Sequence, residues 1–245
     1  MKPVQFLSNS VQIEKIIKGL TLTRSLMVSS ILIGEPYTGK KRLVESIFPK
    51  SLFIDGADHD ALTRALQSHD EIIIYHFDAI PNPERYDFSN KRIIAIADSI
   101  HDSSLIEEKF AFIYHMPPLL ERPEDVTLLT EQFYRSIKEE LMISTESHID
   151  KSQLDLSENI KSLKASLYRQ LVTANLNQEE LEKLIYGYLH ARIEGNNAYR
   201  DHIGLFERPL IQAGLAKYRS QLKLSSVLGL NRNTLRKKIH EHHLD

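Results

Sequence analysis

The segment Ser29-Ser30-Ile31-Leu32-Ile33-Gly34-Glu35-Pro36-Tyr37-Thr38-Gly39-Lys40 decides the fold that the sequence predicts. Its first half is a short β-branched run, typical of a buried strand that enters a turn at Gly34. Residues 34–40 match the pattern G-x-x-x-x-G-K, and a helical pattern follows. In a P-loop of this kind, backbone N–H groups surround phosphates and the lysine reaches the terminal ones. The final Ser or Thr of the pattern is missing, because residue 41 is Lys.

Four more short apolar runs follow this segment, at residues 52–54, 71–77, 92–97 and 112–116. Helical spacing of apolar residues appears between several of them, and also before the first strand, at residues 11–27. Strands that alternate with helices predict a parallel sheet covered on both faces. After Pro117-Pro118 only helical stripes remain. The expected fold class is therefore α/β: a P-loop parallel sheet with helices, then a helical region and an all-α C-terminal domain.

The composition is that of an ordinary globular protein, with 245 residues, 42% hydrophobic and 26% charged. There is no cysteine, which excludes disulfides and thiolate metal sites and fits a reducing compartment. The sequence shows neither the apolar run of a signal peptide nor one long enough to span a bilayer. We therefore expect a cytoplasmic protein without a membrane partner.

The charge is distributed unevenly along the chain. Residues 205–245 hold eight Lys and Arg against three acids, which leaves 23 basic and 30 acidic residues in the remainder. An acidic body with a basic tail indicates an anionic partner at the C-terminus. A solvated charged helix explains the same pattern equally well when charge alone is considered.

Residues 221–239 have the pattern of a helix-turn-helix. A helix with an apolar face ends at Leu228, and Gly229 stands where a left-handed C-cap is needed. Asn231 is a suitable N-cap for a second helix, on which Leu235 and Ile239 point inward. The remaining faces of this helix can present polar side chains to base edges and phosphates.

The stretch Leu228–Lys238 resembles the Fis signature, whose core reads G-I-N-R-x-T-L-R-K-K. Upstream, Phe206–Ile211 resembles the Glu-x-Pro-Leu-Leu segment of the Fis dimerisation helix. The resemblance implies double-stranded DNA as a partner and a homodimer formed through residues 203–219, with Phe206, Leu210 and Leu215 on the buried face. The DNA-binding residues that it implies are Asn231, Arg232, Asn233, Thr234, Arg236, Lys237 and Lys238.

The N-terminal part resembles the NtrC-like bacterial enhancer-binding proteins, AAA+ ATPases that act on sigma-54 RNA polymerase. The loop at 34–41 resembles their G-E-S-G-T-G-K-E, and residues 117–129 resemble the P-P-L-R-E-R-x-E-D-I-x-L-L segment that opens their helical lid. Residues 92–97 resemble their sensor I strand. The resemblance implies ATP or ADP with Mg²⁺ as cofactor, and RNA polymerase or another regulator as partner. The nucleotide-binding residues that it implies are Gly34, Thr38, Gly39, Lys40, Lys41 and Asp78.

The expected domains are a degenerate AAA+ P-loop domain at 1–118, a helical lid-like region and linker at 119–200, and a Fis-type helix-turn-helix domain at 201–245. The clearest linker candidate is Gly195-Asn196-Asn197.

Several parts of the NtrC-like machinery are missing. The best counterpart of its Walker B Asp-Glu is Asp78-Ala79, so no carboxylate activates water there. Tyr37 replaces a loop glycine and would be strained if that position needs positive φ. Only 37 residues separate Lys40 from Asp78, too few for the GAFTGA loop that touches sigma-54. Residues 107–112, where an arginine finger is expected, contain no Arg, and the sensor II segment is absent. These departures predict a domain that is no enzyme and serves as a scaffold or nucleotide sensor.

Eleven histidines raise the question of a metal site. His240, His242 and His243 lie close together but at the end of the terminal helix, and the others lack ligand spacing. We therefore expect no metal centre.

The leading hypothesis is a bacterial, nucleoid-associated transcription regulator that binds DNA as a dimer. One alternative is a working ATPase that activates sigma-54 polymerase. Another is an architectural DNA-bending protein with little sequence preference, as the resemblance to Fis allows.

Overall fold

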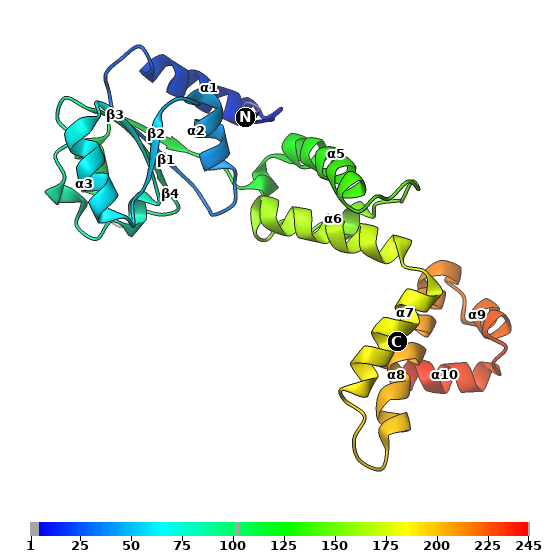
Figure 1. Cartoon of the computed structure of the whole chain (residues 1–245). Coiled ribbons are helices and arrows are strands. Elements are labelled where there is room, and N and C mark those ends of the chain that lie inside the picture. Colours follow the sequence, from blue (N-terminus) through cyan, green and yellow to red (C-terminus); the bar gives the residue numbers. More distant parts are fainter. Residues whose placement is uncertain (1–4, 101–102, 245) are drawn as a thin grey trace. The chain divides into compact units, whose positions relative to one another are not determined.

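The computed structural model of the chain describes residues 5–100 and 103–244 and divides into two compact units, Met1–Asn175 and Leu176–Asp245. Figure 1 shows the order of their elements along the chain. The sequence places its last domain boundary at 200/201, whereas the units separate before α7 (Gln178–His190). The expected linker, Gly195-Asn196-Asn197, lies inside the second unit, in the connection between α7 and α8.

A five-stranded sheet forms the centre of the first unit, in the order β2-β3-β4-β1-β5 with every pair parallel. The strands are β1 (Ser30–Ile33), β2 (Leu52–Asp55), β3 (Glu71–Tyr75), β4 (Arg92–Ala97) and β5 (Phe112–His115). All five predicted strands are present. The third ends earlier than expected, at Tyr75, because His76 adopts a left-handed backbone conformation with φ 52°.

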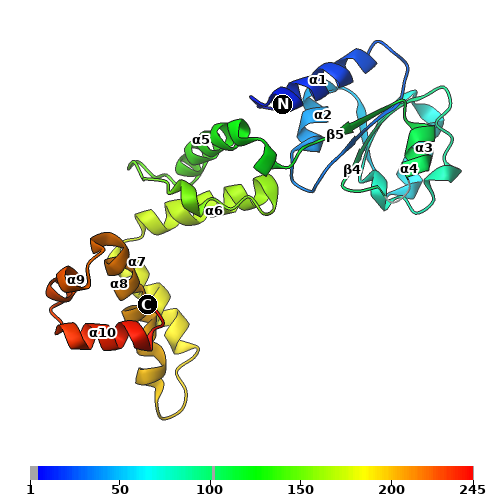
Figure 2. The ribbon, with the colours of Figure 1, turned by 180° about the vertical axis from the view of Figure 1, so that it is seen from behind.

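Helices cover both faces of this sheet, as the alternation of elements predicts. Along β3, Ile73 packs in a cluster with α1 (Val11–Thr23) and α2 (Lys40–Ile47). Its neighbours Ile72 and Ile74 pack in the other cluster, with α3 (His59–Ser68) and α4 (Ser103–Lys109). Figure 2 shows α3 and α4 together on their face of the sheet. Two short 3₁₀ turns, η1 (Phe77–Ala79) and η2 (Pro83–Arg85), connect β3 to β4. The α/β fold class is confirmed.

Two helices that run parallel to each other complete the first unit, both with their N-terminal ends at the loop between β1 and α2. They are α5 (Pro123–Glu140) and α6 (Asn159–Asn175), preceded by η3 (Leu119–Glu121) and joined by a loop that contains η4 (Lys151–Gln153). Leu129 and Ile137 of α5 pack against Leu163, Leu167 and Leu171 of α6 in a core of their own. We call α5 and α6 the lid helices, because they lie within residues 119–200, where the sequence predicts a helical lid-like region and linker.

The second unit is entirely helical and consists of α7, α8 (Ala198–Tyr218), α9 (Gln221–Leu228) and α10 (Arg232–Glu241). Asn177 caps α7 in a reciprocal capping box with Glu180. The buried core is Ile211, Leu224, Leu235 and Ile239. Among the described residues, no helix has both the length and the apolar composition needed to cross a membrane.

Candidate functional site

The loop from β1 to α2 has the conformation that its glycines allow. A Cβ at Gly34 would lie 2.5 Å from the carbonyl oxygen of Met116, so the close approach of these two segments requires glycine. Gly39 caps α2 with φ 98°, and Tyr37 has φ 61°. A side chain in this left-handed region costs roughly 1 kcal/mol. The expected strain at Tyr37 is therefore present.

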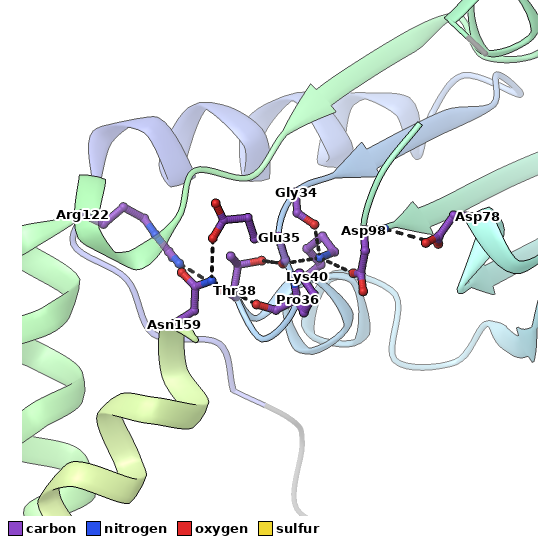
Figure 3. A network of polar contacts seen from close by, with 9 residues as sticks. All are labelled: Gly34, Glu35, Pro36, Thr38, Lys40, Asp78, Asp98, Arg122 and Asn159. Carbon is purple, nitrogen blue, oxygen red and sulfur yellow. Dashed lines mark hydrogen bonds and ion pairs between the residues drawn. The ribbon is translucent and has the colours of Figure 1, made fainter. Parts of the chain in front are cut away.

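Lys40 is buried and turned toward its own loop (Figure 3). Its ammonium group donates to the carbonyl oxygens of Gly34 at 2.5 Å and Glu35 at 2.6 Å. It also donates to the carboxylate of Asp98 at 2.8 Å. Asp98 follows β4 directly, next to β1 in the sheet, and was not among the predicted site residues. An acid at the carboxyl end of a central strand is the signal that could have identified it.

Two buried side chains of the lid region hold the same loop from its other side (Figure 3). Arg122 donates to the carbonyl oxygen of Thr38 at 3.0 Å and to the carboxylate of Asp125 at 3.2 Å. Burial lowers the pKa of Arg122, and Asp125 partly opposes this shift. Asn159, the first residue of α6, donates to the Pro36 carbonyl oxygen and to the Glu35 carboxylate, both at 3.0 Å. The lid helices are thus bonded to the P-loop backbone, which the sequence did not reveal.

A cavity of about 1060 Å³ lies within the first unit, beside this loop. Its walls come from the loop, residues 5–7, the ends of β3 and β4, and helices α2, α5 and α6. Asp98 is the one carboxylate among its described lining residues. Its cationic lining residues are Lys40, Lys41, Arg42, Arg122, Lys161 and Lys164. A solvent-accessible pocket with this charge can hold an anion.

The predicted nucleotide residues fall into three groups around the cavity. Gly39, Lys40 and Lys41 line it, whereas Gly34 and the buried Thr38 shape the loop behind it. Thr38 donates its hydroxyl hydrogen to the Glu35 carbonyl oxygen at 2.9 Å. Asp78 lies in η1, outside the lining, and accepts a hydrogen bond from the Asp98 N–H at 3.3 Å.

Tyr75 and His76, rather than Asp78 and Ala79, stand at the end of β3 and face the cavity. The aromatic ring of Tyr75 lies under the ammonium group of Lys41, 3.7 Å from ring centroid to nitrogen. The Nδ1 atom of His76 lies 3.2 Å from a carboxylate oxygen of Asp55, at the end of β2. Burial raises the pKa of Asp55, but hydrogen bonds from the Ala57 N–H and His76 outweigh it, so the net pKa is lowered.

The described residues contain no group of three or more His, Asp or Glu side chains that could hold a metal ion. The lining of the cavity agrees, because its single carboxylate is paired with Lys40.

The second unit contains the predicted helix-turn-helix in α9 and α10. Gly229 ends α9 with φ 64°, and the side chain of Asn231 accepts a hydrogen bond from the Asn233 N–H at 2.9 Å. Leu235 and Ile239 are buried against α8 and α9. Both caps and the inward-facing pair are therefore confirmed.

Six of the seven predicted DNA-binding residues are exposed: Asn231, Arg232, Asn233, Thr234, Arg236 and Lys237. Lys238 is half-buried and makes an ion pair with Glu207 of α8. The second carboxylate oxygen of Glu207 lies 3.3 Å from the Nε2 atom of His242. Lys238 thus connects α10 to α8 and does not lie on the exposed face of α10. The sequence pattern did not predict this contact.

Helices α7 and α8 expose apolar side chains. Along α7, Leu181, Leu184, Ile185 and Tyr188 recur at i, i+3, i+4 and i+7, and the helix buries no residue. On α8, Phe206 is 64% and Leu210 is 41% exposed, whereas Leu215 packs against the core of its own unit. Two of the three residues expected at a dimer interface are thus available, and α7 adds a stripe that was not expected.

The sequence matches known proteins in both units. Residues 203–242 match the family described as bacterial regulatory protein, Fis family. The DNA-binding transcriptional regulator NtrC of Azospirillum brasilense is 30% identical over 163 residues, which cover 51% of this chain and 34% of that protein. The match thus spans about a third of the length of this relative.

Solved structures of NtrX from Brucella abortus share the fold. The complex with ATP has a TM-score of 0.56 at 13% identity, covering 97% of this chain and 69% of that one. The complex with ADP has a TM-score of 0.52, also at 13% identity, covering 98% and 70%. The chain thus combines a P-loop α/β unit, similar in fold to these NtrX structures, with a C-terminal helix-turn-helix that matches the Fis family over residues 203–242.

Proposed function

We propose that this protein is a transcription regulator that binds double-stranded DNA as a homodimer. The outer face of α10 carries this proposal, because Arg232, Arg236 and Lys237 are exposed on a helix that Leu235 and Ile239 anchor from behind. Cations at these positions can neutralise phosphates, and arginine and asparagine side chains can bond base edges in the major groove. The Fis-family match over the same residues supports this role.

A second copy of the chain is the partner that this mode of binding calls for. Helix-turn-helix dimers place two recognition helices about 34 Å apart, one turn of the duplex. The exposed stripe of α7, together with Phe206 and Leu210 of α8, offers apolar surface for such a contact. Burial of this surface supplies the association free energy.

The P-loop domain, in this proposal, senses a nucleotide or serves as a scaffold and does not hydrolyse ATP. The end of β3 offers Tyr75 and His76 where the resemblance implies an acidic pair, so this strand end supplies no carboxylate to activate water, and the Asp98 carboxylate beside it is paired with Lys40. The NtrX structures of the same fold hold ATP or ADP, which supports a nucleotide as ligand. Because Arg122 and Asn159 bond the loop carbonyls, a ligand that moves the loop would also move the lid helices.

Duplex binding by the full-length chain tests the DNA-binding role. Replacement of both Arg236 and Lys237 by Ala should weaken binding and lower the slope of log K against log salt by about two units, roughly one for each lost phosphate contact. The matched control removes two exposed cations of the first unit, Lys50 and Arg64, and should leave affinity and slope unchanged. Equal affinity and slope for all three proteins would contradict the proposal.

Footprinting on genomic fragments separates the two kinds of DNA-binding protein. Discrete protected sites are expected of a regulator. Uniform protection of unrelated fragments would favour the architectural alternative.

A further inference from the structure

We propose that the P-loop cavity binds a nucleoside polyphosphate without a divalent metal, with Lys41 taking the place of the cation. This inference rests on the proposed nucleotide-sensing role of the first unit. It depends on two positions that handle Mg²⁺ in P-loop NTPases with the full G-x-x-x-x-G-K-[ST] pattern: the residue after the P-loop lysine and the end of the Walker B strand. Here they are Lys41 and Tyr75, and the two side chains contact each other at 3.7 Å.

The residues present do not fit Mg²⁺. This ion requires oxygen ligands in near-octahedral geometry, and an ammonium group supplies none. The phenol of Tyr75 stays protonated, since burial and the nearby Asp55 carboxylate raise its pKa. The carboxylates of Asp55 and Asp98 already have partners: Asp55 is bonded to His76 and the Ala57 N–H, and Asp98 to Lys40.

Lys41 and the other cations that line the pocket do fit a polyanion. Lys41 lies at the N-terminal end of α2, and its ammonium group rests on the Tyr75 ring, which fixes its position without neutralising its charge. Lys164 of α6 adds a second exposed cation to the lining. Because Mg²⁺ cancels part of the charge on a polyphosphate, these cations attract the metal-free form more strongly than the metal complex.

The rest of the lining suits a nucleoside. Phe6, Leu129, Phe133 and Ile160 provide apolar wall beside the cationic part. An aromatic base can pack against such side chains. The volume of about 1060 Å³ is also sufficient for a nucleoside polyphosphate.

Titration of the full-length chain with ATP, in EDTA and in excess Mg²⁺, tests the inference. We expect affinity in EDTA equal to or higher than affinity in Mg²⁺. Lys41→Ala should weaken binding in EDTA about tenfold, as expected for loss of one charge-assisted contact. Lys50→Ala, the control at an exposed lysine outside the cavity, should not change it. Because Lys41 is exposed, its replacement should leave thermal unfolding unaltered, which verifies that the variant is folded.

The possible outcomes separate a failure of metal-free binding from a failure of the nucleotide-sensing role. Binding at least tenfold tighter in Mg²⁺, or no effect of Lys41→Ala in EDTA, overturns metal-free binding and leaves nucleotide sensing intact. Absence of ATP binding under both conditions overturns the nucleotide-sensing role itself. Inorganic triphosphate is the remaining probe, and affinity equal to that of ATP would overturn recognition of a nucleoside.

Discussion

Lys238 of α10 is paired with Glu207 of α8, so the helix expected to read DNA is joined through its inner side to the helix before the helix-turn-helix. His242, one turn later on the chain, approaches the same carboxylate at 3.3 Å. These side chains orient α10 over the core formed by Ile211, Leu224 and Leu235. Lys238 therefore acts on the position of the recognition helix.

This pair predicts a pH-dependent contribution to stability. The hydrogen bond from Lys238 lowers the pKa of Glu207 from 4.5, with His242 adding to the shift. A lowered folded-state pKa stabilises the protein above the unfolded pKa, and this contribution is lost as pH falls through the folded value. Glu207→Gln should therefore lower the melting temperature of the second unit near neutral pH, and the difference from the unaltered chain should shrink below about pH 4.5. Differential scanning calorimetry measures both effects. The control is Glu194→Gln at an exposed residue, and a difference that is constant with pH would contradict the role of this pair.

The buried pair of Arg122 and Asp125 predicts a large effect on the stability of the first unit. Asp125 is 0% exposed and accepts hydrogen bonds from Ser8 and Asn9 as well as from Arg122. Asp125→Ala leaves a buried guanidinium without its counter-charge, which should cost about 3–5 kcal/mol in the free energy of unfolding. Glu124→Ala, at the exposed neighbour in the same helix turn, should cost no more than about 0.5 kcal/mol. Urea denaturation of both variants checks this, and equal losses would mean that the pair does not stabilise the lid.

The apolar stripe of α7 predicts the site of dimerisation. Leu184→Glu places a charge in the stripe and should weaken self-association at least about tenfold, since burial of a leucine contributes roughly 2 kcal/mol. Lys183→Glu changes charge at the opposite side of the same helix and serves as control. Sedimentation equilibrium of the full chain measures the dissociation constant. A dimer unaffected by Leu184→Glu would place the interface elsewhere, and an unaltered chain that stays monomeric with DNA would contradict the dimer.

The resemblance to NtrC-like ATPases implies ATP hydrolysis, whereas the residues of this chain argue against it. We expect no phosphate release above background from ATP and Mg²⁺, with or without DNA. Loss of an arginine finger alone typically lowers such rates about 10³–10⁵-fold, and the end of β3 also lacks the acidic residue. A steady-state assay with Lys40→Ala as the control measures this. Turnover of the order of one per second that disappears in Lys40→Ala would restore the ATPase alternative.

The local features of the molecule were predictable from the sequence. The five parallel strands, the Gly229 C-cap and the Asn231 N-cap follow from residue periodicity and from backbone preferences that span a few residues. The strain at Tyr37 was predictable for the same reason, because only glycine adopts positive φ without cost.

The partners of the charged groups were decided only by tertiary structure. Lys40 bonds Asp98 across 58 positions, Asn159 reaches Pro36 across 123, and Lys238 meets Glu207 across 31. No local pattern encodes such pairs, because strand order and helix packing bring them together after the chain has folded. The end of β3 is the most consequential case, since the left-handed turn at His76 stops the strand at Tyr75 and leaves Asp78 outside the cavity. The sequence by itself thus determined the two kinds of domain, whereas the packing of distant segments decided which side chains face the ligand and which hold the domain together.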